Sequence, residues 1–254
     1  MKKTIVLAEI LSQEKLAPEV NKIELLAPAI AQEAQPGQFV TVAVSDQVAP
    51  LLRRPFGIAD VNKEAGTITL IYRLLGPATH LLDKLLPQAK VSIIGPLGHG
   101  FSLAGKKPLL IGGGMGLAPL HFLATRLSAV PVEVLMGGKT QAELFWTQLF
   151  TDIVKEVHLT TDDGTEGIKG TVMALLPQLL AAGYDSIYVC GPIPMMKAVV
   201  AEVNKTNIPC EVSLEKYMAC GLGACLSCSC QGIGKRLKVC TDGPVFDSRE
   251  VVEW

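Results

Sequence analysis

The chain has 254 residues, of which 49% are hydrophobic and 19% charged, so it allows one large domain or two to three small ones, can bury a sizeable core and is not expected to be disordered. Its 23 Lys and Arg residues against 24 Asp and Glu residues give a net charge of −1, which lacks the basic excess that holds a phosphate backbone. The first apolar run ends at Glu9, too early for a secretory signal, and the uncharged residues 108–125 are broken by glycine and proline. We therefore expect a cytoplasmic protein that binds neither nucleic acid nor membrane.

Residues 1–103 contain short β-prone runs separated by glycine and proline. The predicted strands cover residues 3–7, 20–26, 38–44, 67–72 and 90–94. Many short strands at near-regular spacing predict a small barrel or sandwich. One helix is expected over residues 78–86, where apolar residues recur at helical spacing after a possible N-cap at Thr79 and stop at Pro87.

Residues 104–210 alternate between apolar strands and amphipathic helices. The predicted strands are 108–111, 132–136, 157–160 and 186–190, and the predicted helices lie near 117–127, 141–151, 172–182 and 195–204. This alternation predicts a parallel sheet covered by helices. Residues 211–254 are rich in cysteine and glycine with little periodicity, so we expect a third, small domain that needs a bound metal to hold together.

Five of the seven cysteines fall within residues 220–240, which in a cytosolic chain indicates a metal or redox site before a disulfide framework. Cys220, Cys225 and Cys228 are spaced C-x4-C-x2-C, and Cys240 follows further along the chain. This order is typical of a plant-type [2Fe–2S] cluster, in which a tight loop supplies three thiolates and a distant cysteine the fourth. Small residues between the first two cysteines let backbone amides approach the cluster.

Two alternatives stay open for this cysteine cluster. A structural zinc knuckle also uses four cysteines, but zinc sites favour two C-x2-C pairs and only one is present. Cys230 follows Cys228 by two positions and could compete with it as a ligand, although the spacing favours Cys228. Cys190 and Cys210 lie outside the cluster and read as buried small hydrophobes. The four histidines have no acidic or nucleophilic partner at motif spacing, so we expect no hydrolytic triad.

A glycine-rich run follows the first predicted strand of the middle segment and precedes a helix. Its glycines are Gly112, Gly113, Gly114 and Gly116. Glycines there allow a tight turn and let a diphosphate approach a helix N-terminus, although the run is equally consistent with a plain strand–helix connection. It is not the Rossmann fingerprint, because Pro119 stands where that pattern needs glycine. Cys190, Gly191 and Pro192 end a later strand, and we expect them at the same carboxyl edge of the sheet.

Arginines and an aromatic residue gather in the predicted barrel. One run consists of Arg53, Arg54, Pro55, Phe56 and Gly57. Further along the chain come residues 71–73 and the turn at 76–79. Arginine charge, a flat side chain and a helix N-terminus suit a flavin and its diphosphate. By themselves, however, these residues favour a surface basic pair beside core strands.

The order of these motifs resembles a known family. The chain resembles the electron-transfer subunit of dihydroorotate dehydrogenase type B, in the ferredoxin–NADP reductase superfamily. The motifs that carry this resemblance are, in chain order, RRPFG, IYR, GGGMGLAP, TDDG, CGPIPMM, EKYMACGLGACLSC and CTDGPVF. The resemblance covers essentially the whole chain. It implies an FAD-binding antiparallel β-barrel over residues 1–103, an NAD-binding parallel-sheet α/β domain over 104–210 and a small [2Fe–2S] domain over 211–254.

The resemblance also assigns residues to each group. The cluster ligands would be Cys220, Cys225, Cys228 and Cys240, and the FAD contacts would be Arg54, Pro55, Phe56, Gly57, Ile71, Tyr72, Arg73, Ala78 and Thr79. The glycines at 112–114 and 116, with Cys190, Gly191 and Pro192, would contact NAD+. Two positions depart from the family, because many relatives have serine at Gly57 and glycine at Ala78. A hydroxyl contact to the flavin is therefore missing at Gly57.

The resemblance implies a function in pyrimidine (UMP) biosynthesis. The partner would be an FMN-containing catalytic subunit that oxidises dihydroorotate, with two copies of each chain in the complex. Electrons would run from FMN through [2Fe–2S] and FAD to NAD+. Alternatives are a reductase subunit of a sulfhydrogenase or of a flavin-based transhydrogenase and, outside enzymes, a zinc-stabilised scaffold. The sequence leaves NADP+ open, because Lys139 follows a predicted strand without a ribose-binding acid.

Overall fold

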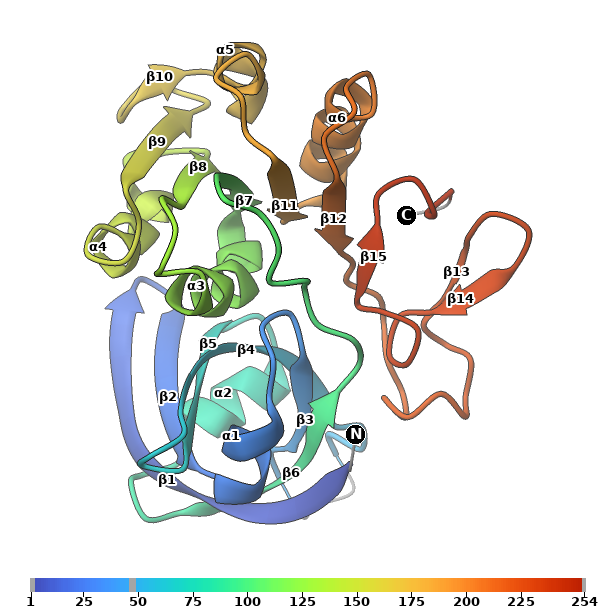
Figure 1. Cartoon of the computed structure of the whole chain (residues 1–254). Helices are drawn as coiled ribbons and strands as arrows, with labels where there is room; N and C mark the ends of the chain where they lie inside the picture. Colours follow the sequence, from blue (N-terminus) through green and yellow to red (C-terminus); the bar gives the residue numbers. More distant parts are fainter. Residues whose placement is uncertain (1–2, 46–48, 253–254) are drawn as a thin grey trace.

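The computed structural model describes residues 3–45 and 49–252. Figure 1 shows a barrel built from the N-terminal third, a helix-covered sheet stacked on it, and a C-terminal segment packed along the side of both. None of the helices in the described ranges has the length and apolar character needed to cross a bilayer. The predicted barrel, parallel sheet and C-terminal segment are confirmed.

The barrel is closed and antiparallel, in the order β1-β2-β5-β4-β3-β6. Its strands are β1 (Thr4–Ala17), β2 (Val20–Leu26), β3 (Phe39–Ala43), β4 (Arg54–Asn62), β5 (Thr67–Arg73) and β6 (Lys90–Leu97). Alternate side chains such as Ile23, Val40 and Leu70 fill its interior and are fully buried. Closure removes the unpaired strand edges that an open sheet would expose.

Three details of the barrel differ from the sequence-based expectation. Strand β4 was not predicted, because Pro55 and Gly57 interrupt its apolar pattern. A second helix, α1 (Pro28–Glu33), was also missed. The predicted helix is α2 (Pro77–Asp83), whose N-cap is Gly76 and not Thr79. Thr79 lies inside the first turn, where its Oγ1 accepts a hydrogen bond from the backbone N–H of Gly76 at 3.2 Å.

The sheet has the order β10-β9-β8-β7-β11-β12-β15. Its strands are β7 (Pro108–Gly113), β8 (Glu133–Gly138), β9 (Glu156–Thr161), β10 (Ile168–Lys169), β11 (Ser186–Cys190), β12 (Cys210–Ser213) and the antiparallel β15 (Val245–Asp247). Sequential strands run from β7 toward β9 on one side, whereas β11 and β12 lie on the other. The chain therefore reverses direction beside β7, and ligands of open α/β sheets bind at the carboxyl ends of strands at such a point.

Two of the four covering helices are much shorter than predicted, whereas the first and the last lie close to their predicted ranges. The four helices are α3 (Leu117–Arg126), α4 (Trp146–Phe150), α5 (Leu176–Leu180) and α6 (Ile193–Val203), with single 3-10 turns at η1 (Gly114–Gly116), η2 (Gln141–Leu144) and η3 (Val172–Ala174). Two of the predicted long helices are thus a 3-10 turn followed by a short α-helix. Pro177 falls in the first turn of α5, where its missing N–H breaks no helical hydrogen bond.

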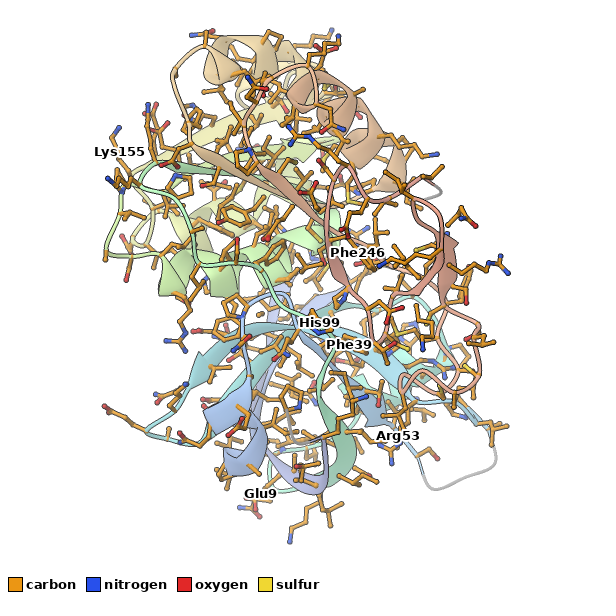
Figure 2. The ribbon with its side chains drawn as sticks, turned by 45° about the vertical axis from the view of Figure 1, so that its right-hand side comes forward. Glu9, Phe39, Arg53, His99, Lys155 and Phe246 are labelled. Carbon is orange, nitrogen blue, oxygen red and sulfur yellow. The ribbon has the colours of Figure 1, made fainter. Side chains whose placement is uncertain are left out.

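The C-terminal segment is held to both other parts. It contains the hairpin β13 (Ser229–Gln231) and β14 (Arg236–Lys238), and its strand β15 pairs with β12. The backbone N–H of His99, just after β6, donates to the carbonyl of Gly243 at 2.6 Å. Figure 2 shows Phe39, His99 and Phe246 near one another where the barrel, the sheet and this segment meet. These contacts fix the cysteine-rich segment against the barrel.

A buried ion-pair network lies at the amino end of the sheet, away from the glycine-rich turn. Glu133, at the start of β8, is 4% exposed. It accepts hydrogen bonds from Lys155 at 2.9 Å and His158 at 3.1 Å, and the hydroxyl of Tyr184 also donates to it. Burial alone would raise the pKa of Glu133, but these three donors outweigh it and lower the pKa from 4.5 to about 2.

The Glu133→Gln substitution should lower the free energy of unfolding by about 3 kcal/mol at pH 7. A carboxyl whose pKa falls on folding stabilises the folded state above its unfolded pKa. That contribution is lost as the pH falls from 4.5 toward 2. Urea unfolding of both proteins at pH 7 and pH 3 measures the effect, and the difference should shrink to about 1 kcal/mol at pH 3. An equal difference at both pH values would contradict the network.

Candidate functional site

The loop that carries the first three predicted ligands folds around the thiol of Cys220. The backbone N–H of Leu222 donates to the Sγ atom of Cys220 at 3.3 Å, and that of Cys225 donates at 3.4 Å. Amides that point at a ligating sulfur favour its thiolate form and help to set the potential of an iron–sulfur cluster. The loop therefore directs two backbone amides at the first of the predicted ligands.

Gly221 explains why this loop needs glycine beside its first cysteine. Its φ is +68°, and a Cβ atom there would lie only 2.9 Å from Cγ2 of Thr41 in β3. Any other residue would be strained in its backbone and would collide with the barrel. The cysteine loop thus packs directly on β3.

The four predicted ligands form one group of thiols. Hydrogen bonds from Ser227 lower the pKa of Cys225 to about 6, and the neighbouring Cys220 contributes. Burial, together with the nearby Cys228 and Cys220, raises the pKa of Cys240 to about 12. The exposed thiol of Cys225 thus ionises readily, whereas the buried thiol of Cys240 needs a nearby cation in order to ionise.

A zinc ion and a cluster of two irons require different distances between these four thiols. A tetrahedral zinc ion bonds sulfur at about 2.3 Å, which brings its four thiolates within roughly 4 Å of one another. Within residues 3–45 and 49–252, one set of three or more possible ligand atoms lies within 4.8 Å of one another. It consists of Glu133, Glu156 and His158. Among the described residues, no three cysteine thiols meet that limit. A cluster of two irons needs two thiolates on each iron and does not require all four sulfurs to be that close.

The other three cysteines lie in apolar surroundings. Cys230 is 1% exposed in β13, opposite Leu237 of β14, within the core that also holds Cys228 and Cys240. Burial raises the pKa of the thiol of Cys190, and raises that of Cys210 to about 12. Cys190 and Cys210 are thus poor thiolate ligands, as the sequence indicated.

The glycine-rich turn meets the end of β11, as predicted. Cys190 pairs with Gly112 across parallel strands. A Cβ atom at Gly116 would lie 2.5 Å from the backbone of Cys190, so only glycine fits there. Gly114 differs, because its φ is +56° and a Cβ atom would meet nothing within 4 Å. A ligand can therefore approach the backbone at Gly114, at the carboxyl edge of the sheet.

The two neighbouring arginines of the barrel have different surroundings. Arg53 donates to the carbonyl of Ser92 at 2.7 Å and to its hydroxyl at 2.8 Å, which anchors it on β6. Among the residues that the structure describes, Arg54 reaches only the carbonyl of Leu52, two residues away, on an exposed surface. A short local contact is easily exchanged for a phosphate, whereas the Arg53 contacts hold two strands together. Arg54 is therefore the arginine available to a ligand.

Other predicted flavin residues are committed to the barrel through their side chains. Tyr72 is 2% exposed, its hydroxyl donates to Gln13 at 2.9 Å, and burial raises its pKa to about 12. Its ring lies 5.6 Å from that of Phe56, at an angle of 58°. The Oγ1 of Thr79 accepts hydrogen bonds from the backbone N–H groups of residues 75 and 76. The hydroxyls of Tyr72 and Thr79 are thus both engaged in hydrogen bonds within the barrel domain.

All three predicted sites converge on one side of the barrel. The turn η1 contacts β5, and Pro119 of α3 comes within 3.6 Å of a Cβ atom placed at Gly57. In the ladder between β3 and β4, Thr41 pairs with Pro55, and Thr41 also touches the cysteine loop at Gly221. The flavin motif of β4 thus lies between the glycine-rich turn and the cysteine loop. Sequence reasoning missed Thr41, because a threonine in a short strand carries no local signal.

The chain combines a closed barrel, a parallel sheet with a glycine-rich turn and a cysteine loop packed on the barrel. These features define a ferredoxin–NADP reductase-like oxidoreductase with an appended iron–sulfur domain. A ferredoxin NADP+ reductase from Neisseria gonorrhoeae, with bound FAD and NADP, shares the fold with a TM-score of 0.65 at 17% identity, over 80% of this chain and 92% of that one. The structure of an NADH-dependent reduced ferredoxin-NADP oxidoreductase, studied for flavin-based electron bifurcation, gives a TM-score of 0.87 at 29% identity, over 98% and 90%.

Residues 215–252 match the family model of the iron-sulfur cluster binding domain of dihydroorotate dehydrogenase B. The chain is 39% identical to the dihydroorotate dehydrogenase B (NAD(+)) electron transfer subunit of Geobacillus thermodenitrificans over 96% of both chains, and 39% identical to that of Desulforamulus reducens over 96% of this chain and 97% of the relative. The chain belongs to this family of electron transfer subunits. It is an oxidoreductase subunit that works with a catalytic partner, which confirms the resemblance seen in the sequence.

Proposed function

We propose that this chain passes electrons from an FMN-containing, dihydroorotate-oxidising subunit to NAD+ during cytoplasmic pyrimidine biosynthesis, in a complex with two copies of each chain. The convergence of the cysteine loop, the β4 motif and the glycine-rich turn carries this proposal. A flavin exchanges hydride with nicotinamide and single electrons with an iron–sulfur cluster, so it must stand between the two. The β4 motif occupies that middle position.

The residues of this chain divide the work among three sites. Residues 1–103 hold FAD, with Arg54 paired to the diphosphate and the backbone of β4 and β5 supporting the ring. Residues 104–210 hold NAD+, with its diphosphate at Gly114. Residues 211–254 hold [2Fe–2S] through Cys220, Cys225, Cys228 and Cys240. The backbone amides that point at Cys220 and the open backbone at Gly114 support these roles.

A partner surface surrounds the exposed thiol of Cys225. In the same loop, Leu222 and Leu226 are 42% and 60% exposed, and Tyr217, eight residues before Cys225 in the chain, is 95% exposed. Large apolar and aromatic side chains left in water are typical of protein interfaces. Single-electron transfer needs the donor close to the cluster, so this apolar patch is where the catalytic subunit would dock.

The Arg54→Ala substitution should weaken FAD binding by about 10- to 100-fold, which is the loss of a charge-assisted hydrogen-bond pair. Iron content should not change, because Arg54 lies outside the cysteine loop. The measurement is the flavin retained after gel filtration, followed by a titration with FAD.

Arg53→Ala is the matched control, because it removes the same charge but loses contacts to Ser92. It should lower thermal stability more than FAD affinity. Full flavin retention in Arg54→Ala would place the diphosphate elsewhere.

A reconstitution experiment tests the proposed function. The purified full chain should contain iron, sulfide and FAD, and should oxidise NADH with an artificial electron acceptor. It should not turn over dihydroorotate until the FMN subunit is added, when NAD+-dependent oxidation should appear. Turnover of dihydroorotate by the chain alone would overturn the proposal.

A second candidate is a reductase subunit of a flavin-based transhydrogenase. The TM-score of 0.87 to the NADH-dependent reduced ferredoxin-NADP oxidoreductase favours it, although that identity is 29% against 39% for the dihydroorotate dehydrogenase B relatives. The chain that co-purifies with this one decides between them. An FMN protein active on dihydroorotate supports the proposal, whereas a partner that couples NADH to NADP+ and ferredoxin supports the alternative.

A further inference from the structure

One buried hydroxyl beside the cysteine loop has no hydrogen-bond partner. Thr41 is 2% exposed, and among the described residues nothing lies within hydrogen-bonding distance and angle of its Oγ1 atom. A buried hydroxyl without a partner is unfavourable, and such groups in native proteins often face a bound ligand. In residues 3–45 and 49–252, no cysteine sulfur accepts a hydrogen bond from this hydroxyl.

The strand alternation of β3 places Thr41 on the outside of the barrel. Val40 and Val42 point into the barrel core, whereas Phe39 belongs to the core shared with the C-terminal segment. Ile94 of β6, which pairs with Thr41, belongs to that same shared core. The side chain of Thr41 is thus enclosed between the barrel and the cysteine-rich segment.

Contacts place Thr41 between the cluster loop and the flavin motif. Its Cγ2 atom lies 2.9 Å from the position of a Cβ atom at Gly221, next to the ligand Cys220. Its cross-strand neighbour is Pro55 of the β4 motif. Cys220 already accepts two backbone N–H groups from its own loop. Thr41 is therefore the barrel side chain set to complete the donors around the cluster.

We propose that the hydroxyl of Thr41 donates a hydrogen bond to the iron–sulfur cluster and raises its reduction potential. This inference rests on the proposed function, since it requires a cluster on the four cysteines. Reduction adds negative charge to a cluster, and a donor aimed at its sulfur stabilises the reduced form. Thr41 acts as a positioning and tuning residue, because it neither ligates iron nor touches nicotinamide.

The test compares Thr41→Val and Thr41→Ser in the full chain, purified anaerobically with its cluster and flavin. Valine keeps the shape of threonine and removes the hydroxyl, whereas serine keeps the hydroxyl. In a redox titration followed by electron paramagnetic resonance, Thr41→Val should change the ratio of reduced to oxidised cluster about tenfold at a fixed potential. For a one-electron couple this is a shift of about 59 mV to a more negative value. Thr41→Ser should stay near the wild-type potential.

Thr147→Val is the matched control. The hydroxyl of Thr147 is also buried without a partner among the described residues, but it lies in α4, far from the cysteine loop (Figure 1). It should leave the cluster potential unchanged. The resonance signal comes only from clusters that are present, so the potential can be measured even where occupancy falls.

Three results would overturn the inference about Thr41. They are an unchanged cluster potential in Thr41→Val, an equal shift in Thr147→Val, or a shift confined to the flavin. Absence of any cluster from the wild-type chain would instead overturn the proposed function, and the inference with it.

Discussion

The Cys228→Ala variant should lose its iron–sulfur cluster while it keeps FAD. Cys228 is buried beside Cys240, so its removal would take away one of the two thiolates of one iron inside an apolar core. We expect iron to fall from about two atoms per chain to nearly none, and coupled dihydroorotate oxidation to fall by more than about 100-fold, because no route for single electrons remains. NADH oxidation with an artificial two-electron acceptor should persist. Iron and sulfide analysis with absorption spectra measures these changes.

Cys230→Ala is the control for that experiment. Cys230 is as buried as Cys228, so both variants create a similar small cavity in the same core. Only the ligand should matter for iron content, and Cys230→Ala should retain the cluster at somewhat lower thermal stability. Loss of iron in Cys230→Ala with retention in Cys228→Ala would reverse the assignment of the third ligand. Cys225→Ser, at an exposed position, tests a second ligand with little risk to folding.

The Leu226→Glu variant should lower coupled dihydroorotate oxidation by at least about tenfold, because a carboxylate would be buried in an apolar interface. Leu226 is 60% exposed beside the cysteine loop, so the folded chain itself should tolerate the charge. Cluster content and NADH oxidation by artificial acceptors should match the wild type. Steady-state assays at increasing concentrations of the FMN subunit measure the effect, which should appear as weaker binding of that subunit.

Leu86→Glu is the matched control for the docking surface. Leu86 is 73% exposed just after α2 of the barrel, away from the cysteine loop, and receives the same charge. Its coupled activity should equal that of the wild type. Equal loss in both variants would indicate a general effect of added charge, and unaltered coupling in Leu226→Glu would move the docking surface elsewhere.

The sequence alone was sufficient where a physical requirement leaves a local pattern. Cluster ligands must come from a short loop and one distant thiolate, so the spacing of Cys220, Cys225, Cys228 and Cys240 predicts the site. A parallel strand buried on both faces needs a continuous apolar run, and a helix needs its period, so the alternation after residue 104 predicts the sheet. The glycine-rich turn follows likewise, because Gly116 must pass close to the backbone of Cys190.

Tertiary structure decided whatever depends on residues distant in sequence. Strand β4 escaped prediction because barrel closure, and not its own propensity, holds Pro55 and Gly57 in a strand. Arg53 and Arg54 look alike in sequence, and only the position of Ser92 on β6 makes one structural and leaves the other free. The role that we propose for Thr41 depends on the cysteine loop, which packs on β3 beside the Thr41 side chain. Local sequence fixes the chemistry that a segment can offer, whereas long-range packing determines which group it meets.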